Sequence, residues 1–188
     1  NLFYIGLFLL PSAFSIAAIL LFISLVISTF NRKNNFFKDK LNIFFLAGGF
    51  LMILSSFVHT FKNNLTPYEL NSNLSWIGLA NWLPFFWCYW GFKPFLNSHE
   101  KRKKSGLFLL SGTFPVLITG IGQSFFNWDG PFEIFNGLIV WYQRPLEGIT
   151  GLTGLFNNPN YAGSWLNVIW PFSIAALLDE TKYLAKNI

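Results

Sequence analysis

Long apolar runs separated by short polar stretches dominate this chain of 188 residues. Each run is about as long as a helix that crosses a hydrocarbon core, which needs roughly 20 residues. We therefore expect an all-α, polytopic membrane protein whose five spans cover residues 2–30, 41–61, 76–92, 106–126 and 159–178. The first run exceeds the required length, so we expect it either to tilt or to begin in the membrane interface as far as Pro11.

One long connection, residues 127–158, contains a helical pattern of its own. Its segment PFEIFNGLIVWYQ begins with a proline, which suits a first helical turn, and apolar residues then recur at helical spacing at Phe132, Phe135, Leu138, Ile139 and Tyr142. The pattern predicts a short helix that lies either flat in the outer interface or as a re-entrant or buried loop helix. Long connections often carry function, so this loop is the first place to look for a site.

The composition agrees with lipid as the main solvent. Aromatic residues make up 20% of the chain and charged residues 11%, against about 25% charged residues in soluble domains. The single cysteine, Cys88, excludes an internal disulfide. We expect residues 1–188 to form one transmembrane domain and to be part of a longer chain, because the sequence begins with Asn1 and its first run lacks a signal-peptide cleavage site.

The basic residues predict the orientation of the spans, because Lys and Arg gather on the cytoplasmic side of a membrane. Only Lys62 and Arg144 fall on one side, and the other eleven of the 13 basic residues fall on the opposite side: Arg32, Lys33, Lys38, Lys40, Lys93, Lys101, Arg102, Lys103, Lys104, Lys182 and Lys186. The chain is then expected to begin outside and to end in the cytoplasm, with residues 62–75 and 127–158 outside.

The net charge of +5 is on this interpretation an orientation signal, and we expect no nucleic-acid partner. The run HEKRKK at 99–104 is the densest basic stretch. It is interpreted first as part of this topology signal, and contact with anionic lipid head groups is the alternative.

The last apolar run begins with the clearest helix start in the sequence. In NNPNYAGSW, Asn158 can cap exposed backbone donors, and Pro159 suits the first helical position because its missing N–H would have no partner there. A helix from Pro159 to Leu178 would be about 30 Å long, one membrane thickness. Its amino end would face the exterior with free N–H groups and about half a positive charge, which suits a phosphate.

Residues before this helix start could complete an anion site. Gly148, Gly151 and Gly154 recur at every third position and allow a close approach of the backbone, and Arg144 carries the guanidinium of this outer loop. A guanidinium can hold a diphosphate through paired hydrogen bonds. The competing interpretation is purely structural: Asn158 is an ordinary cap, the glycines pack a neighbouring helix, and Arg144 anchors the chain at the interface.

The stretch GLTGLFNNPNYAGSWLNVIWPF resembles the motif region of the bacterial O-antigen ligase and O-antigen polymerase superfamily. There a G-x-F-x-N-P-N element opens a transmembrane helix after an external loop. The matching residues are Gly154, Phe156, Asn158, Pro159 and Asn160. The resemblance covers about twenty residues together with the multi-span topology around them.

The resemblance implies a GT-C-type glycosyltransferase of the bacterial inner membrane that needs no metal or other cofactor. Such an enzyme moves a glycan from undecaprenyl diphosphate to an acceptor hydroxyl at the periplasmic face. Its partners are a lipid-linked oligosaccharide donor, a glycan or lipid acceptor, and membrane lipids. The substrate-binding residues would be Arg144, Gly154, Asn158 and Asn160.

The chain also departs from that family. Many relatives place an arginine three residues before the motif glycine, where this chain has Gly151, so the diphosphate role passes to Arg144. Family members also carry more spans and a second large periplasmic loop with basic residues and a histidine. The resemblance therefore implies that this chain is the N-terminal part of such an enzyme.

The reaction also requires a proton acceptor for the attacking hydroxyl, commonly a histidine or a carboxylate. His59, near the outer end of the second expected span, is the weak candidate, against the simpler interpretation of a histidine hydrogen-bonded between helices. Two rival functions stay open: a subunit of a transporter or lipid-glycan flippase, and a non-catalytic membrane subunit. A transport path would use polar residues within spans, and Asn42, Asn81 and Gln123 are the uncharged candidates.

Overall fold

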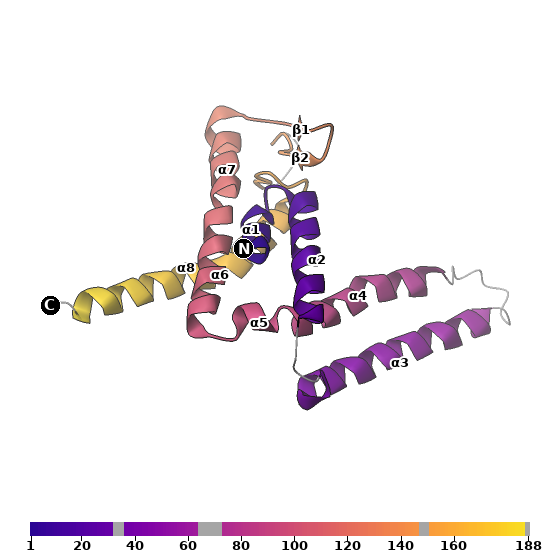
Figure 1. Cartoon of the computed structure of the whole chain (residues 1–188). Helices are drawn as coiled ribbons and strands as arrows, with labels where there is room; N and C mark the ends of the chain where they lie inside the picture. The colour runs from indigo at the N-terminus through magenta and orange to yellow at the C-terminus, as the bar shows by residue number, and fades with distance from the viewer. Residues whose placement is uncertain (32–35, 64–72, 147–150, 187–188) are drawn as a thin grey trace. The chain divides into compact units, whose positions relative to one another are not determined.

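The computed structural model describes residues 1–31, 36–63, 73–146 and 151–186, and it is mostly helical (Figure 1). It divides into two compact units: unit 1 comprises Asn1–Ser24 and Phe95–Ile188, and unit 2 comprises Leu25–Pro94. The elements are α1 (Leu2–Leu9), α2 (Phe14–Phe30), the 3-10 turn η1 (Phe36–Lys38), α3 (Lys40–Asn63), α4 (Asn73–Gly91), α5 (Lys93–Leu96), α6 (His99–Gly112), α7 (Phe114–Phe126), β1 (Phe132–Ile134), β2 (Ile139–Trp141) and α8 (Pro159–Lys186).

The first apolar run is a pair of antiparallel helices in unit 1. A turn at Pro11 separates α1 from α2, and the N–H of Ala13 donates to the carbonyl oxygen of Leu9 at 2.8 Å. Gly6 of α1 lies so close to Leu21 of α2 that a Cβ at Gly6 would be 2.8 Å from Leu21 Cγ. Residues 2–30 therefore do not form one continuous helix: the chain reverses direction after Leu9, near Pro11, where the run was expected to begin if its start lies in the interface.

Helix α1 runs parallel to α6. The rings of Tyr4 and Phe108 lie 5.4 Å apart, and the ammonium of Lys104 lies 4.5 Å from the centre of the Tyr4 ring. Further along, Phe8 contacts Gly112 at the end of α6. The chain thus begins at the same end of α6 as the basic run 101–104, whereas the sequence analysis expects the start of the chain and this run on opposite sides of a membrane.

Helix α8 runs antiparallel to α6. Trp165 Nε1–H donates to Thr113 Oγ1 at 3.1 Å, the Phe172 ring packs on Gly106, and Asp179 pairs with Lys103 at 2.5 Å. These contacts follow α6 from its carboxyl end toward its amino end as α8 proceeds. The helix start at Pro159 is therefore at the opposite end of α8 from the basic run, as the sequence predicts.

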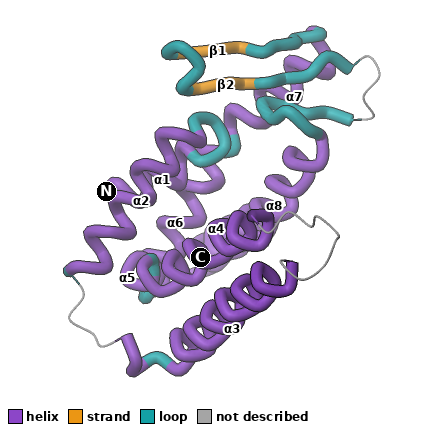
Figure 2. Tube along the Cα trace, turned by 90° about the vertical axis from the view of Figure 1, so that its right-hand side faces the viewer, coloured by secondary structure: helices purple, strands orange, loops and turns teal. Residues whose placement is uncertain are grey.

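The segment expected as a loop helix is a β-hairpin. Strands β1 and β2 pair antiparallel, with Phe132 opposite Trp141 and Ile134 opposite Ile139 (Figure 2). The backbone is left-handed at Asn136 (φ 52°) and Gly137 (φ 82°), and an Asn-Gly pair favours a hairpin turn. The helical prediction for residues 131–143 is wrong because this turn and the flanking β-branched residues outweigh the apolar spacing.

Unit 2 is built on the antiparallel pair α3 and α4. Ring contacts run along its whole length, from Phe45 against Tyr89 to Phe57 against Trp76, whose centroids lie 5.0 Å apart. The end of α2 packs on the end of α4, where Trp87 Nε1–H donates to Thr29 Oγ1 at 3.0 Å. Aromatic side chains therefore contribute much of the packing between these two helices.

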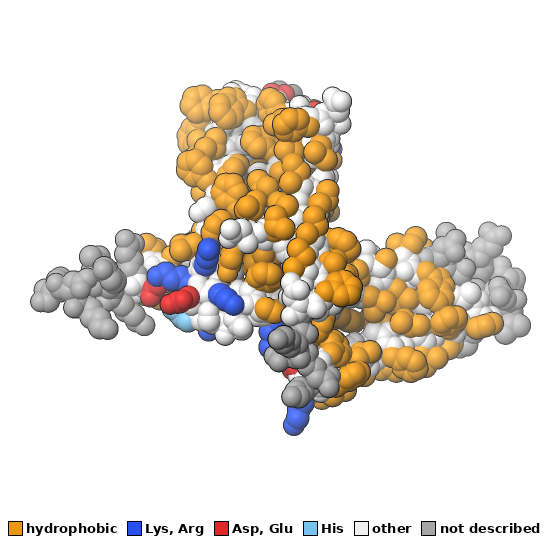
Figure 3. Space-filling view, viewed as in Figure 1, with side chains coloured by type: hydrophobic (Ala, Val, Ile, Leu, Met, Phe, Trp, Pro, Cys, Tyr) orange, Lys and Arg blue, Asp and Glu red, His pale blue; other side chains and the backbone are white. Residues whose placement is uncertain are grey.

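Within the described residues, three helical segments are long and apolar enough to cross a membrane: Lys40–Phe61, His99–Phe126 and Pro159–Asp179. Phe14–Phe30 is apolar but shorter, and α4 interrupts its apolar residues with Asn73, Ser75 and Asn81. The expected five spans are thus not all found. Large apolar side chains face outward, among them Phe44 at 72% and Phe125 at 77% exposed, and hydrophobic atoms cover the face around α7 in Figure 3. Three such helices are the pattern of a multi-pass membrane protein.

The close contact of α1 with α6 makes a test of the packing. A Cβ at Gly112 would lie 2.2 Å from the carbonyl oxygen of Phe8, whereas a Cβ at Gly120 of α7 would meet no atom within 4 Å. We expect Gly112→Ala to lower the free energy of unfolding by about 1–3 kcal/mol through overpacking. Gly120→Ala should leave it unchanged or raise it by about 0.5–1 kcal/mol. Thermal unfolding of both variants in detergent checks this, and equal melting temperatures would contradict the packing.

Candidate functional site

The buried side chain of Gln123 on α7 holds two distant parts of the loop 127–158. Its Oε1 accepts from the N–H of Thr153 at 2.9 Å and from the N–H of Gly154 at 3.0 Å. Its Nε2 donates to the carbonyl oxygen of Arg144 at 2.5 Å and to Thr153 Oγ1 at 3.0 Å. Both ends of the amide are therefore used to fix the loop, and none of its bonds goes to a second polar residue within a span.

Thr153 connects the two loop segments. Its hydroxyl accepts from the N–H of Arg144 at 3.1 Å and donates to the carbonyl oxygen of Gly154 at 3.3 Å. The side chain is fully buried. Together with the bonds of Gln123, this fixes the backbone of Arg144 at both its N–H and its C=O.

Gln143 attaches the hairpin to the same helix. This buried side chain donates from Nε2 to the carbonyl oxygens of Trp128 at 3.1 Å and Thr119 at 3.4 Å. The backbone carbonyl oxygen of Gln143 accepts from the N–H of Gly130 at 2.8 Å. We call Gln123, Gln143 and Thr153 the glutamine–threonine network. Gln143 directly precedes Arg144 and Thr153 directly precedes Gly154. Gln123 forms hydrogen bonds to the backbone of both Arg144 and Gly154.

The Arg144 side chain is exposed, in contrast to its anchored backbone. Its guanidinium carbon lies 6.0 Å from the centre of the Tyr142 ring, at the outer limit of a cation–π contact. A guanidinium on a fixed backbone loses less entropy when it binds an anion than one on a flexible loop. The structure therefore places Arg144 as an accessible cation at a defined position of the loop.

Gly154 is buried and has a packing role. Its backbone is left-handed (φ +54°), and a Cβ would lie 3.2 Å from the carbonyl oxygen of Val116 on α7. Its N–H is already used by Gln123. The close approach expected at Gly154 is thus made to α7, and Gly148, expected to share it, lies outside the described residues.

Asn158 and Asn160 stand at the amino end of α8. Asn158 Oδ1 accepts from the N–H of Asn160 at 2.8 Å, and Pro159 is the first helical residue, so the expected cap is confirmed. Both asparagines are exposed. This helix start presents polar side chains and the positive end of the helix dipole to the surroundings.

A cavity of about 320 Å³ lies beside these residues. The α1–α2 turn forms one wall with Pro11 and Ser12, and Tyr142, Phe156 and Asn157 form another. Trp141 Nε1–H donates to the carbonyl oxygen of Ser12, one of the lining residues, at 2.7 Å. Phe156, one of the motif residues, therefore lines the same cavity as Tyr142.

His59 lies in the other unit, on α3, where its side chain is exposed. Its neighbour Thr60 accepts from Trp76 Nε1–H at 3.1 Å, which connects α3 to α4 without His59. The structure therefore joins Arg144 and Gly154 through the glutamine–threonine network and sets Asn158 and Asn160 a few residues further on. His59 belongs to unit 2.

The sequence interpretation missed Gln143 and Thr153. The available signal was a glutamine within an expected span, Gln123, together with a glutamine beside Arg144 in the following loop. A buried amide needs hydrogen-bond partners, so a loop that packs on that span could supply them. Among the described residues, no buried side-chain nitrogen or oxygen is without a hydrogen-bond partner. In the same part of the chain, no three His, Cys, Asp or Glu side chains gather to hold a metal.

No protein-family model, curated protein or solved structure matches this chain.

The glutamine–threonine network predicts the effect of removing Gln123. We expect Gln123→Leu to lower the free energy of unfolding by about 2–4 kcal/mol, because the N–H groups of Thr153 and Gly154 lose a buried acceptor. Hydrogen exchange of these two amides should rise. Ser124→Ala, an exposed neighbour on α7, is the control and should change stability by less than about 0.5 kcal/mol. Unchanged exchange at residues 153 and 154 would refute the anchoring role.

Proposed function

We propose that this chain is part of a membrane glycosyltransferase of the O-antigen ligase or polymerase type. In this proposal it transfers a glycan from undecaprenyl diphosphate to an acceptor hydroxyl at the periplasmic face of the bacterial inner membrane. The observation that carries the proposal is the start of α8. A capped, exposed N-P-N element opens a helix of membrane-spanning length and follows a loop that presents an anchored, exposed Arg144.

The chemistry of the reaction explains why such an arrangement is useful. The acceptor oxygen forms a bond to the anomeric carbon while the bond from that carbon to the diphosphate oxygen breaks, so negative charge develops on the leaving diphosphate. Fixed donors and cations aimed at that charge lower the barrier. Arg144 would supply a forked cation, and the first turn of α8, with Asn158 and Asn160, would supply amide donors and the positive helix end.

The geometry changes the part that Gly154 plays in this proposal. Because its N–H bonds to Gln123 and its Cα packs on α7, Gly154 would position the turn before α8 and leave donor contact to Arg144, Asn158 and Asn160. His59, the weak candidate for the proton acceptor, lies on α3 in unit 2, so this proposal assigns no catalytic base.

The membrane orientation is part of the proposal. Within unit 1, the basic residues 101–104 lie at one end of α6 and the start of α8 lies toward the other. The positive-inside rule would put the basic end in the cytoplasm and the hairpin with Asn158 outside, where an isoprenoid diphosphate and its glycan meet the acceptor.

A transport function has less support. The polar residues that could have marked a path bind within the fold: Asn42 Nδ2 donates to the carbonyl oxygen of Phe36 at 2.9 Å, and Gln123 holds the outer loop. Every buried polar side chain among the described residues is uncharged. Coupling ions and charged substrates are usually bound by ionisable groups or unwound helices, so the polar inventory favours the enzyme.

Arg144 gives the most direct test of the donor site. In the complete protein we expect Arg144→Ala to lower the turnover of lipid-linked glycan by roughly 100-fold, since one charge-stabilising donor is lost. Arg144→Lys should restore only part of it, because the ammonium lacks the fork. Glu133→Gln, an exposed charge change on β1 of the same loop, should leave turnover unchanged. Wild-type turnover in Arg144→Ala with normal membrane insertion would remove the assignment.

Asn158 allows capping to be separated from donor binding. Aspartate caps helices about as well as asparagine, so Asn158→Asp should keep stability within about 0.5 kcal/mol. A carboxylate there would repel the diphosphate, so we expect turnover to fall by roughly tenfold or more. Melting temperature and glycan consumption are measured on the same preparation. A variant that is both stable and fully active would show that Asn158 is a cap alone.

A further inference from the structure

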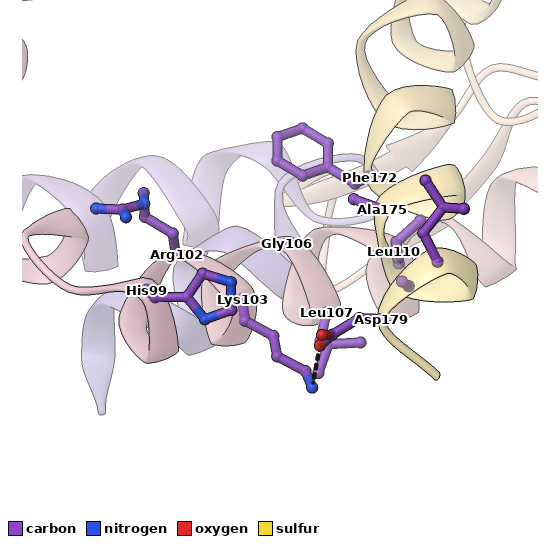
Figure 4. Close-up of a pocket in the computed structure, with 11 residues that line it drawn as sticks. His99, Arg102, Lys103, Gly106, Leu107, Leu110, Phe172, Ala175 and Asp179 are labelled. Atoms are coloured by element: carbon purple, nitrogen blue, oxygen red, sulfur yellow. Dashed lines mark ion pairs between the residues drawn. The ribbon is translucent and has the colours of Figure 1, made fainter. Parts of the chain in front are cut away.

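A second and larger cavity, of about 730 Å³, lies between α6 and α8 at the basic end of unit 1 (Figure 4). It is independent of the residues of the proposed donor site. Its lining divides into a charged part and an apolar part. The charged part consists of His99, Arg102 and Lys103 on the first turns of α6 and Asp179 on α8.

The charged part is matched to an anion with several oxygen acceptors. Arg102 Nη1–H donates to the carbonyl oxygen of Leu96 at 3.1 Å, and a guanidinium has further N–H donors that can bind phosphate oxygens. Lys103 pairs with Asp179, but this pair is half exposed, with 53% of the lysine and 37% of the aspartate side chain accessible. An exposed pair of this kind contributes little, so a phosphate can take over the lysine.

The apolar part continues from the charged part along the groove between the two helices. Gly106 allows the Phe172 ring to approach α6 closely, with a Cβ there 3.0 Å from the ring, and Leu107, Leu110 and Ala176 complete the walls. Leu107 is 44% exposed although it faces this groove. A free phosphate or nucleotide would leave these carbon atoms in contact with water, whereas an acyl chain would cover them.

We propose that this cavity binds an anionic phospholipid, with its phosphate on Arg102 and Lys103 and one acyl chain along Leu107 and Leu110. Its volume falls within the roughly 300–1,000 Å³ of small-molecule sites. Basic pockets between membrane helices on the cytoplasmic side are suited to such head groups. In this proposal the basic run 99–104 has a second role besides its expected part in the topology signal. Three of its members, His99, Arg102 and Lys103, line the cavity.

The cavity distinguishes between members of the run 99–104. His99, Arg102 and Lys103 are among its lining residues, with Lys103 extended to Asp179 in Figure 4, whereas Lys101 and Lys104 do not line it. Lys104 is directed instead to the ring of Tyr4, on α1. Two pairs of substitutions with the same change in net charge therefore separate a specific site from a diffuse basic surface.

The test is binding of dioleoyl phosphatidylglycerol, compared with dioleoyl phosphatidylcholine, to the complete, delipidated protein in detergent, with bound lipids counted by native mass spectrometry. We expect the wild type to prefer phosphatidylglycerol. Arg102→Gln with Lys103→Gln should weaken that lipid by about 20-fold, whereas Lys101→Gln with Lys104→Gln should change it less than about threefold. Equal losses in the two pairs, or no lipid preference in the wild type, would overturn the proposal.

Two further measurements test alternative explanations: that the double variant binds less lipid because it misfolds, and that the cavity binds any phosphate ester. Asp179→Asn removes the carboxylate that competes for Lys103, so it should strengthen phosphatidylglycerol binding, and weaker binding would overturn the head-group contact. Glycerol 3-phosphate in excess should leave the bound lipid in place, because it lacks an acyl chain. Its displacement of the lipid would show that the site takes a free phosphate ester.

Discussion

A single buried carboxamide on α7 holds the backbone of the loop 127–158 at two distant places. Gln123 lies in α7, within the candidate span His99–Phe126, and its amide meets backbone groups of Arg144, Thr153 and Gly154. A buried amide without partners would cost several kcal/mol in an apolar environment, so loop and helix satisfy each other. These hydrogen bonds fix the backbone that carries the exposed Arg144 side chain and the backbone that leads into α8.

The same principle explains why the loop lies against α7 without a large apolar core. Thr153 is fully buried, and its hydroxyl is used both as acceptor and as donor. Backbone groups that would otherwise need water are paired with side chains. Polar networks of this kind have defined geometry only when every member is satisfied, which is the case for the buried side chains that the structure describes.

Local signals in the sequence predict local features well. The cap at Asn158, the helix start at Pro159 and the helical state of the long apolar runs all depend on residues within one or two turns of each other. The hairpin shows the limit of such signals, because Phe132, Leu138 and Ile139 fit a helical stripe as well as two strands. The Asn136–Gly137 pair favours the hairpin, and its left-handed backbone in the structure shows that the turn outweighs the helical spacing. The glutamine–threonine network could not be predicted, because Gln123 and Thr153 are 30 positions apart in sequence.

The bond between the Trp141 indole and the carbonyl oxygen of Ser12 has a consequence for biosynthesis. It joins positions that are 129 residues apart, so the α1–α2 turn leaves the ribosome long before its partner exists. At about 5–20 residues per second, roughly 6–26 seconds of translation separate the two. The α1–α2 turn must therefore exist for that time without this contact, and unit 1, which joins Asn1–Ser24 to residues from Phe95 onward, can close only after Trp141 has been made.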